Sequence, residues 1–130
     1  MPSCVLRAAG RDLDVDAVLA DQPLLKPDAL WRAGERDEQG RAHPGSGFVL
    51  WVADEPDWRT VLDRTLERLD LLRGLLADVK SRSGMLEIEF TVEVGKPDVP
   101  PTITLPPGPL RRIGEHGVTV RVTAVATAPR

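Results

Sequence analysis

The stretch DEPDWRTVLDRTLERLDLLRGLLADVKSRSG, residues 54–84, decides the fold, because apolar side chains recur in it at spacings of three and four. Such spacing places them on one stripe of an α-helix. The stripe consists of Trp58, Val61, Leu62, Thr65, Leu66, Leu69, Leu72, Leu76 and Val79. Asp54 or Asp57 can cap the start of the helix, and Gly84 can end it. We therefore predict one long amphipathic helix of about 36 Å, enough to cross a small sheet.

The stretch that follows, MLEIEFTVEVG at 85–95, alternates between apolar and polar residues. One side would carry Leu86, Ile88, Phe90, Val92 and Val94, and the other Glu87, Glu89, Thr91 and Glu93. This pattern is typical of a half-buried strand with one face in water. The run FVLWVA at 48–53, which precedes the long helix in the sequence, has the pattern of a buried strand.

The remaining elements are shorter. We expect strands at 4–9, 102–105 (an edge strand between prolines) and 118–126, a helix capped by Asp12 or Asp14, and a helical turn in 106–117 with Leu110 and Ile113 inward. The order predicts one α+β domain over residues 1–130. Its core would be a single mostly antiparallel β-sheet with one long and two short helices. The simplest topology is a split βαβ or ferredoxin-like plan.

The segment KPDALWRAGE, residues 26–35, fits neither a helix nor a strand. Leu24, Leu25, Leu30 and Trp31 would pack tightly, and the polar residues 36–47 would form a mobile tip. Trp31 would fold inward and close one end of the core, since an indole buries about 200 Å². The alternative is that Trp31, Arg32 and Glu35 line a groove for a partner or small ligand.

Composition excludes several classes of function. The formal net charge is −3 and no basic block occurs, so neither nucleic acid nor an anionic membrane is an expected partner. The single cysteine excludes an internal disulfide and a cysteine-ligated metal site. The start of the chain has no secretory signal pattern and no apolar run reaches the ~20 residues of a membrane span. We expect a cytoplasmic protein, and the excess of arginine over lysine indicates a bacterial source.

No pattern of catalytic residues emerges. His43 and His116 lie far apart and read as loop and turn residues, and Cys4 reads as a small core residue. The alternation at Asp12, Asp14 and Asp16 resembles a calcium loop but lacks its glycine and distant glutamate, so helix capping explains it better. Phosphate-binding glycine motifs are absent from the sequence. We therefore predict no catalytic residue, metal or cofactor, while an enzymatic function stays open.

The acidic row Glu87, Glu89 and Glu93 has two interpretations. It is either a solvated strand face that discourages edge pairing or a contact surface for a basic partner.

Several motifs together resemble the bacterial domain of unknown function 4279. They are GRDLDVDAVLA with Leu13, Asp14 and Asp16, the segment with Pro27, Trp31 and Gly34, and the closing LRRIGEHGVTVRV with Leu110, Gly114 and Val118. The resemblance covers nearly the whole chain, although the loop at 36–47 is longer and FVLWVADEPDW only loosely follows the usual join. It implies no catalytic residues. Similar small bacterial domains include toxin-immunity proteins, in which an acidic face blocks the toxin.

The first hypothesis is accordingly a non-catalytic protein-interaction module, immunity-like in form, with Glu87, Glu89 and Glu93 or the 31–47 loop as its surface. The alternative is a small-ligand-binding or enzymatic domain with a pocket beside Trp31. A homo-oligomeric subunit is a third reading.

Overall fold

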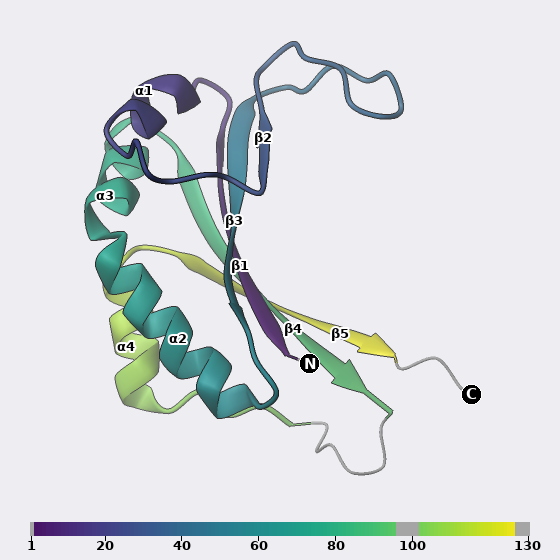
Figure 1. Ribbon diagram of the computed structural model, residues 1–130, viewed down its shortest axis with the longest axis vertical. Helices are drawn as coiled ribbons and strands as arrows, with labels where there is room; N and C mark the ends of the chain where they lie inside the picture. The colour runs from purple at the N-terminus through teal and green to yellow at the C-terminus, as the bar shows by residue number, and fades with distance from the viewer. Residues whose placement is uncertain (1, 96–101, 127–130) are drawn as a thin grey trace.

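The computed structural model describes residues 2–95 and 102–126. Within these ranges the chain forms five strands and four helices (Figure 1). In chain order they are β1 (Ser3–Gly10), α1 (Val15–Ala20), β2 (Ala29–Trp31), β3 (Ser46–Asp54), α2 (Trp58–Leu71), α3 (Arg73–Ser81), β4 (Met85–Val94), α4 (Pro107–Glu115) and β5 (Thr119–Ala126).

The strands form one sheet in the order β2-β3-β1-β4-β5. Each neighbouring pair is antiparallel except β4 and β5, which are parallel. Because β3 and β4 are both antiparallel to β1, they run parallel to each other with β1 between them, and α2 and α3 connect them. The α+β class, the mostly antiparallel sheet and the split βαβ unit are therefore confirmed. The last connection adds a parallel pair, since α4 leads back to β5 beside β4.

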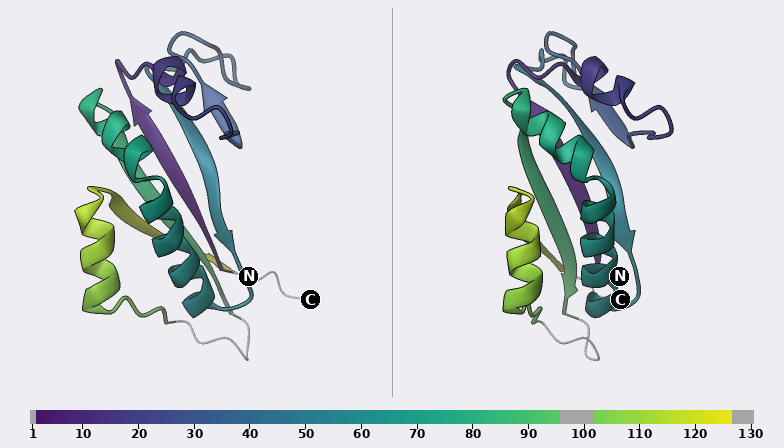
Figure 2. Two further views of the ribbon diagram at one scale, coloured as in Figure 1. Left: turned by 60° about the vertical axis from the view of Figure 1, so that its left-hand side comes forward. Right: turned by 90° about the vertical axis from the view of Figure 1, so that its left-hand side faces the viewer.

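The helices lie on one side of the sheet, as Figure 2 shows. The core fills the space between the helices and the facing strand residues. From the sheet it takes Cys4, Leu6, Ala8, Phe48, Leu50, Leu86, Ile88 and Phe90, all buried. The helical stripe supplies the opposite wall, including Val61, Leu69 and Val79 without exposure to solvent. The apolar side predicted for β4 therefore packs against the apolar stripe predicted for the helix.

The prediction of one long helix is wrong, because the helix is broken at Leu72. Leu72 has φ −93° and ψ 11°, outside helical geometry, yet its side chain stays buried. The hydrogen bonds from Leu72 N to Arg68 O and from Leu76 N to Leu72 O persist across the break. Gly74, a poor helix former, lies in the first turn of α3. The stripe therefore continues through two helices, and the described chain has four helices where three were predicted.

Two other predicted elements differ. Residues 102–105 form no strand, and Thr104 O accepts a hydrogen bond of 2.9 Å from Trp58 Nε1. Trp58 also packs edge-on against Phe90, with ring centroids 4.8 Å apart, so this segment is held at the end of the core. Leu110 is exposed on α4, while Ile113 is buried as predicted. The loop at 96–101, predicted from its prolines, lies outside the described residues.

The segment expected to be irregular contains a short strand. Ala29, Leu30 and Trp31 form β2, which pairs with Val49, Phe48 and Gly47 of β3. Of the side chains expected to pack tightly before residue 32, Leu25 contacts the core and Trp31 packs outside it, whereas Leu24 is 95% exposed and Leu30 is 40% exposed. Beyond β2 the chain closes on itself: Gly34 N donates to His43 O, and His43 N donates to Glu35 O. This loop projects at the upper edge of Figure 1, and backbone hydrogen bonds link its two arms.

Helix starts follow the predicted capping. Asp14 accepts from Ala17 N at 3.0 Å, and Asp57 accepts from Thr60 N at 2.9 Å. Among the helices in the described ranges, none has the length and hydropathy that a bilayer crossing requires.

Candidate functional site

The side of the sheet opposite the helices is the candidate site, and we call it the open face. Strand alternation and the register place a continuous set of side chains on it. They are Val5, Arg7 and Ala9 of β1, Gly47, Val49 and Trp51 of β3, Met85, Glu87, Glu89, Thr91 and Glu93 of β4, and Arg121, Thr123 and Val125 of β5. In both views of Figure 2 the helices lie away from this face.

The centre of the open face is a ladder of charged side chains across β1, β4 and β5. Arg7 contacts Glu87 at 3.0 Å and Glu89 at 3.6 Å. Arg121 contacts Glu87 at 3.2 Å from the other side. Thr123 Oγ1 donates to Glu89 Oε2 at 2.6 Å, and this bond, together with Arg7, lowers the pKa of Glu89. Both glutamates are therefore engaged by neighbours within the sheet.

The ladder changes the interpretation of the predicted acidic row. The Glu87 and Glu89 side chains are only 21% exposed, and each already has an arginine partner. Glu93 is half-buried on the same face, level with Val125 of β5. The row does not protect a sheet edge, because β5 pairs with β4 along its length. Sequence reasoning missed the arginines, which are distant in the chain.

The half of the open face nearer β2 is apolar. Trp51 lies directly opposite Val5 across β3 and β1, and its side chain is 53% exposed. Val49, the next open-face residue of β3, is half-buried. The backbone is fixed on the β2 side, since Trp51 N donates to Asp28 Oδ2 at 2.7 Å. A large aromatic ring in water beside two valines is the kind of surface that protein interfaces bury.

The exposure of Trp51 was missed because FVLWVA reads as a buried run. Phe48 and Leu50 point to the core, and Val49 and Trp51 point to the open face. The register then shifts between Cys4 and Val5, and a bulge in β3 returns Ala53 to the core side. The two-residue period of a strand places Trp51 opposite to Leu50, but a run that is apolar at every position does not show which side is exposed.

Trp31 rests on the open face, so the prediction that it closes one end of the core is wrong. A Cβ at Gly47 would lie 2.5 Å from Cζ2 of Trp31, so the indole lies directly on the glycine backbone. The ring also stacks on His43, with centroids 5.9 Å apart and planes at 30°. The physical reason is the strand itself: β2 pairs Trp31 with Gly47, and both residues then point to the same side.

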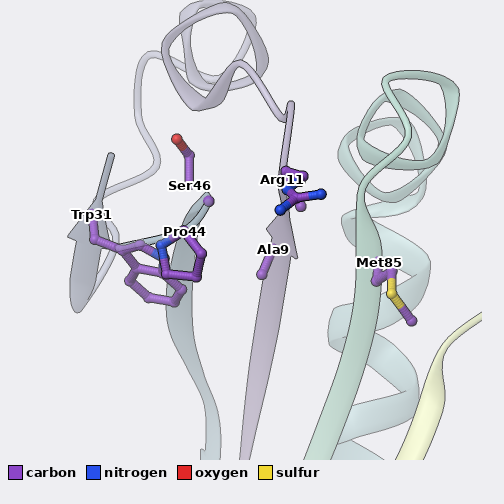
Figure 3. Close-up of a pocket in the computed structure, with 8 residues that line it drawn as sticks. Ala9, Arg11, Trp31, Pro44, Ser46 and Met85 are labelled. Carbon is purple, nitrogen blue, oxygen red and sulfur yellow. The ribbon is translucent and has the colours of Figure 1, made fainter. Parts of the chain in front are cut away.

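Beside Trp31 the open face is hollowed into a cavity of about 320 Å³. Figure 3 shows Trp31 and Pro44 on one side of it, Met85 on the other and Ala9 between them. Arg11 lies at its upper end and is exposed, and within the described residues its guanidinium has no ion-pair partner. The cavity thus combines apolar walls with one cationic group. It lies beside Trp31, where the alternative hypothesis expected a pocket.

Arg32 and Glu35, predicted to share a groove with Trp31, lie elsewhere. Arg32 binds both carboxylate oxygens of Asp16 on α1, at 3.0 and 2.7 Å, and this contact lowers the pKa of Asp16. Glu35 accepts from Arg32 N at 2.7 Å and donates its own N–H to Arg32 O, which closes a turn. Successive residues of an extended chain point to opposite sides, so the side chain of Arg32, directly after β2, points to the helical side while Trp31 points to the open face.

A second polar cluster joins α2 to the end of α4. Asp70 contacts His116 Nε2 at 2.9 Å and Arg112 at 2.7 Å. The hydrogen bond to His116 and then that to Arg112 lower the pKa of Asp70. His116 is the C-terminal cap of α4, in agreement with its prediction as a turn residue. The cluster fixes the position of α4 on the helical layer.

The structure also shows the surroundings of Cys4 and of the possible metal ligands. Cys4 is buried, and burial raises the pKa of its thiol to about 12, so it remains protonated at neutral pH. Over residues 2–95 and 102–126, no group of three or more His, Cys, Asp or Glu side chains could hold a metal ion.

The open face therefore gathers Trp31 and the glutamates of β4, separates them from Arg32 and Glu35, and adds Trp51 and two arginines. The chain matches none of the protein-family models, curated proteins or solved structures with which it was compared.

Proposed function

We propose that the protein is a non-catalytic interaction module that binds a partner protein with its open face, centred on Trp51. The observation that carries the proposal is Trp51 itself, whose side chain is half in water beside Val5 and Val49. Tryptophan is among the residues that dominate binding energy when an interface buries them. The surface is formed by paired strands, so a partner would meet a pre-organised surface.

The charge ladder supplies the polar border of this proposed interface. Among the described residues, three glutamates and two arginines give this part of the open face a net charge of −1 (2 − 3 = −1). A partner would therefore present an apolar group to Trp51 and mixed polar groups to the ladder. An immunity role through a bare acidic face has less support, because Glu87 and Glu89 are engaged within the sheet. Membership of the domain of unknown function 4279 family is likewise a proposal, supported by the motifs around Leu13, Trp31 and Leu110.

The test begins with capture of a partner from the source cells, its identification and its purification. Calorimetric titration of that partner then compares the wild type with Trp51→Ala. We expect binding at least tenfold weaker for the variant, a loss typical of a central aromatic contact. Leu71→Ala is the matched control, since Leu71 is 82% exposed on α2, in the helical layer. Equal affinity for Trp51→Ala and the wild type would reject the open face as the interface.

A second candidate function rests on the cavity beside Trp31. Its apolar walls and the guanidinium of Arg11 favour a small aromatic compound that carries a carboxylate. The probe is 3-phenylpropionate, followed by tryptophan fluorescence, with 3-phenylpropanamide as the uncharged comparison. Binding of the acid alone, lost in Arg11→Gln and kept in Arg111→Gln on α4, would support this function. The same weak response to acid and amide would count against it.

A further inference from the structure

We propose that the outer edge of β5 pairs antiparallel with β5 of a second copy of this chain, which joins two five-stranded sheets into one. The strand order leaves β2 and β5 at the two edges of the sheet. β5 pairs with β4 from Thr119 to Ala126, and within the described residues no strand pairs with its other side. Its outward N–H and C=O groups are therefore a template for another strand.

The β5 edge has none of the features by which proteins block such pairing. Its sequence, TVRVTAVA, contains no proline, lysine or glycine, and its register with β4 is continuous, without a bulge. The single charge, Arg121, is directed back into its own sheet by Glu87 at 3.2 Å. The opposite edge is different, since β2 has only three residues and follows Pro27 and Asp28. Only one of the two edges is thus blunted.

Apolar side chains at this edge are left in water by the single chain. Val122 and Val125 are each 46% exposed. They belong to opposite faces of the sheet, because Val122 is level with the buried Phe90 and Val125 with Glu93. A strand added along the edge would cover part of both, whereas a partner docked on either face alone would cover one. The exposure therefore favours an edge contact.

Charge complementarity favours a second copy as the occupant. In an antiparallel pair, facing residues share a face, so a register centred on Val122 places Val122 against itself and Arg121 against Thr123 of the other copy. Thr123 holds the carboxylate of Glu89 at 2.6 Å. Arg121 of each copy would thus approach a glutamate of the other. A register centred on Arg121 would oppose two guanidinium groups and is disfavoured.

The two-fold axis of this pairing is normal to the sheet, so both helical layers stay on one side and the two open faces become one. A strand pairing of this length is a small interface. We therefore expect a reversible dimer whose population rises with protein concentration. The inference does not depend on the proposed function of Trp51.

Sedimentation equilibrium of the purified chain, up to about 1 mM, is the first test. We expect dimer formation by the wild type and its loss in Val122→Lys and Val125→Lys, because an edge lysine opposes strand addition. Leu71→Lys, an equally apolar exposed site on α2, is the matched control and should leave the dimer intact. A wild type that stays monomeric throughout, or a dimer that both edge variants retain, would overturn the proposal.

Disulfide trapping keeps the test valid if a lysine variant fails to fold. Val122→Cys should form a covalent dimer under mild oxidation, faster than Leu71→Cys, while the buried Cys4 stays unreactive. Equal trapping rates for the two cysteine variants would contradict the β5 contact.

Discussion

Trp51 and Val5 face each other across β3 and β1, and both project from the side of the sheet that carries no helix. On the other side of the same strands, Leu50 and Leu6 also face each other and are buried under the helices. The sheet is therefore apolar on both sides in this region, although the described chain covers only one. This difference between the two faces is the basis of the proposed interaction surface.

The contact between Trp31 and Gly47 predicts that Gly47→Ala destabilises the fold. The added methyl group would lie 2.5 Å from both Ala8 O and the indole, and the backbone oxygen cannot move without disturbing the β1–β3 pairing. We expect a loss of about 1–3 kcal/mol in the free energy of unfolding, measured by urea titration. Gly74→Ala is the control, since a Cβ there meets nothing within 4 Å and helix propensity favours alanine. Equal stability of the two variants would contradict the placement of Trp31.

The cluster at Asp70 predicts a defined dependence of stability on pH. Because folding lowers the pKa of Asp70, its ionised form stabilises the native state above the unfolded carboxyl pKa of about 3.9. This contribution disappears as the pH falls through the lower folded value. Asp70→Asn should therefore be less stable than the wild type at pH 6, and the difference should shrink below pH 4, as measured by thermal unfolding at each pH. A difference that grows on acidification would refute the contacts of Asp70 with His116 and Arg112.

The buried thiol of Cys4 predicts low reactivity in the native protein. Burial raises its pKa to about 12, so little thiolate exists at pH 8, and the side chain has no exposure to solvent. Ellman's reagent should label the native chain slowly and the chain in 6 M guanidinium at once. Immediate stoichiometric labelling of the folded protein would show that β1 does not lie under the helical layer.

The sequence pattern was sufficient for the class of fold because it is local. The alternation of residues 85–94 and the spacing of the leucines between Trp58 and Val79 each identify one buried side, and the two sides pack together. The break at Leu72 does not change this spacing, because Leu69 before it, Leu72 itself and Leu76 after it are all buried. Capping at Asp14 and Asp57 was also readable, since it depends on the nearest few residues.

The candidate site was less predictable, because it depends on the register between distant strands. Glu87 meets Arg7 and Arg121 only through the pairing of β1, β4 and β5. In the same way, β2 exists because β3 lies beside it, and three residues carry too little pattern to indicate a strand. Trp51 was hidden in an apolar run that is compatible with burial on both faces.

Hydroxyl-radical footprinting of the free protein and of its complex with the captured partner tests the central claim most directly. The account predicts rapid oxidation of Trp51 and Met85 in the free protein, slow oxidation of the buried Phe48, and loss of reactivity at Trp51 in the complex while Leu71 on α2 stays reactive. Slow oxidation of Trp51 in the free chain, or protection confined to the helical layer in the complex, would contradict the assignment of the open face as the binding surface.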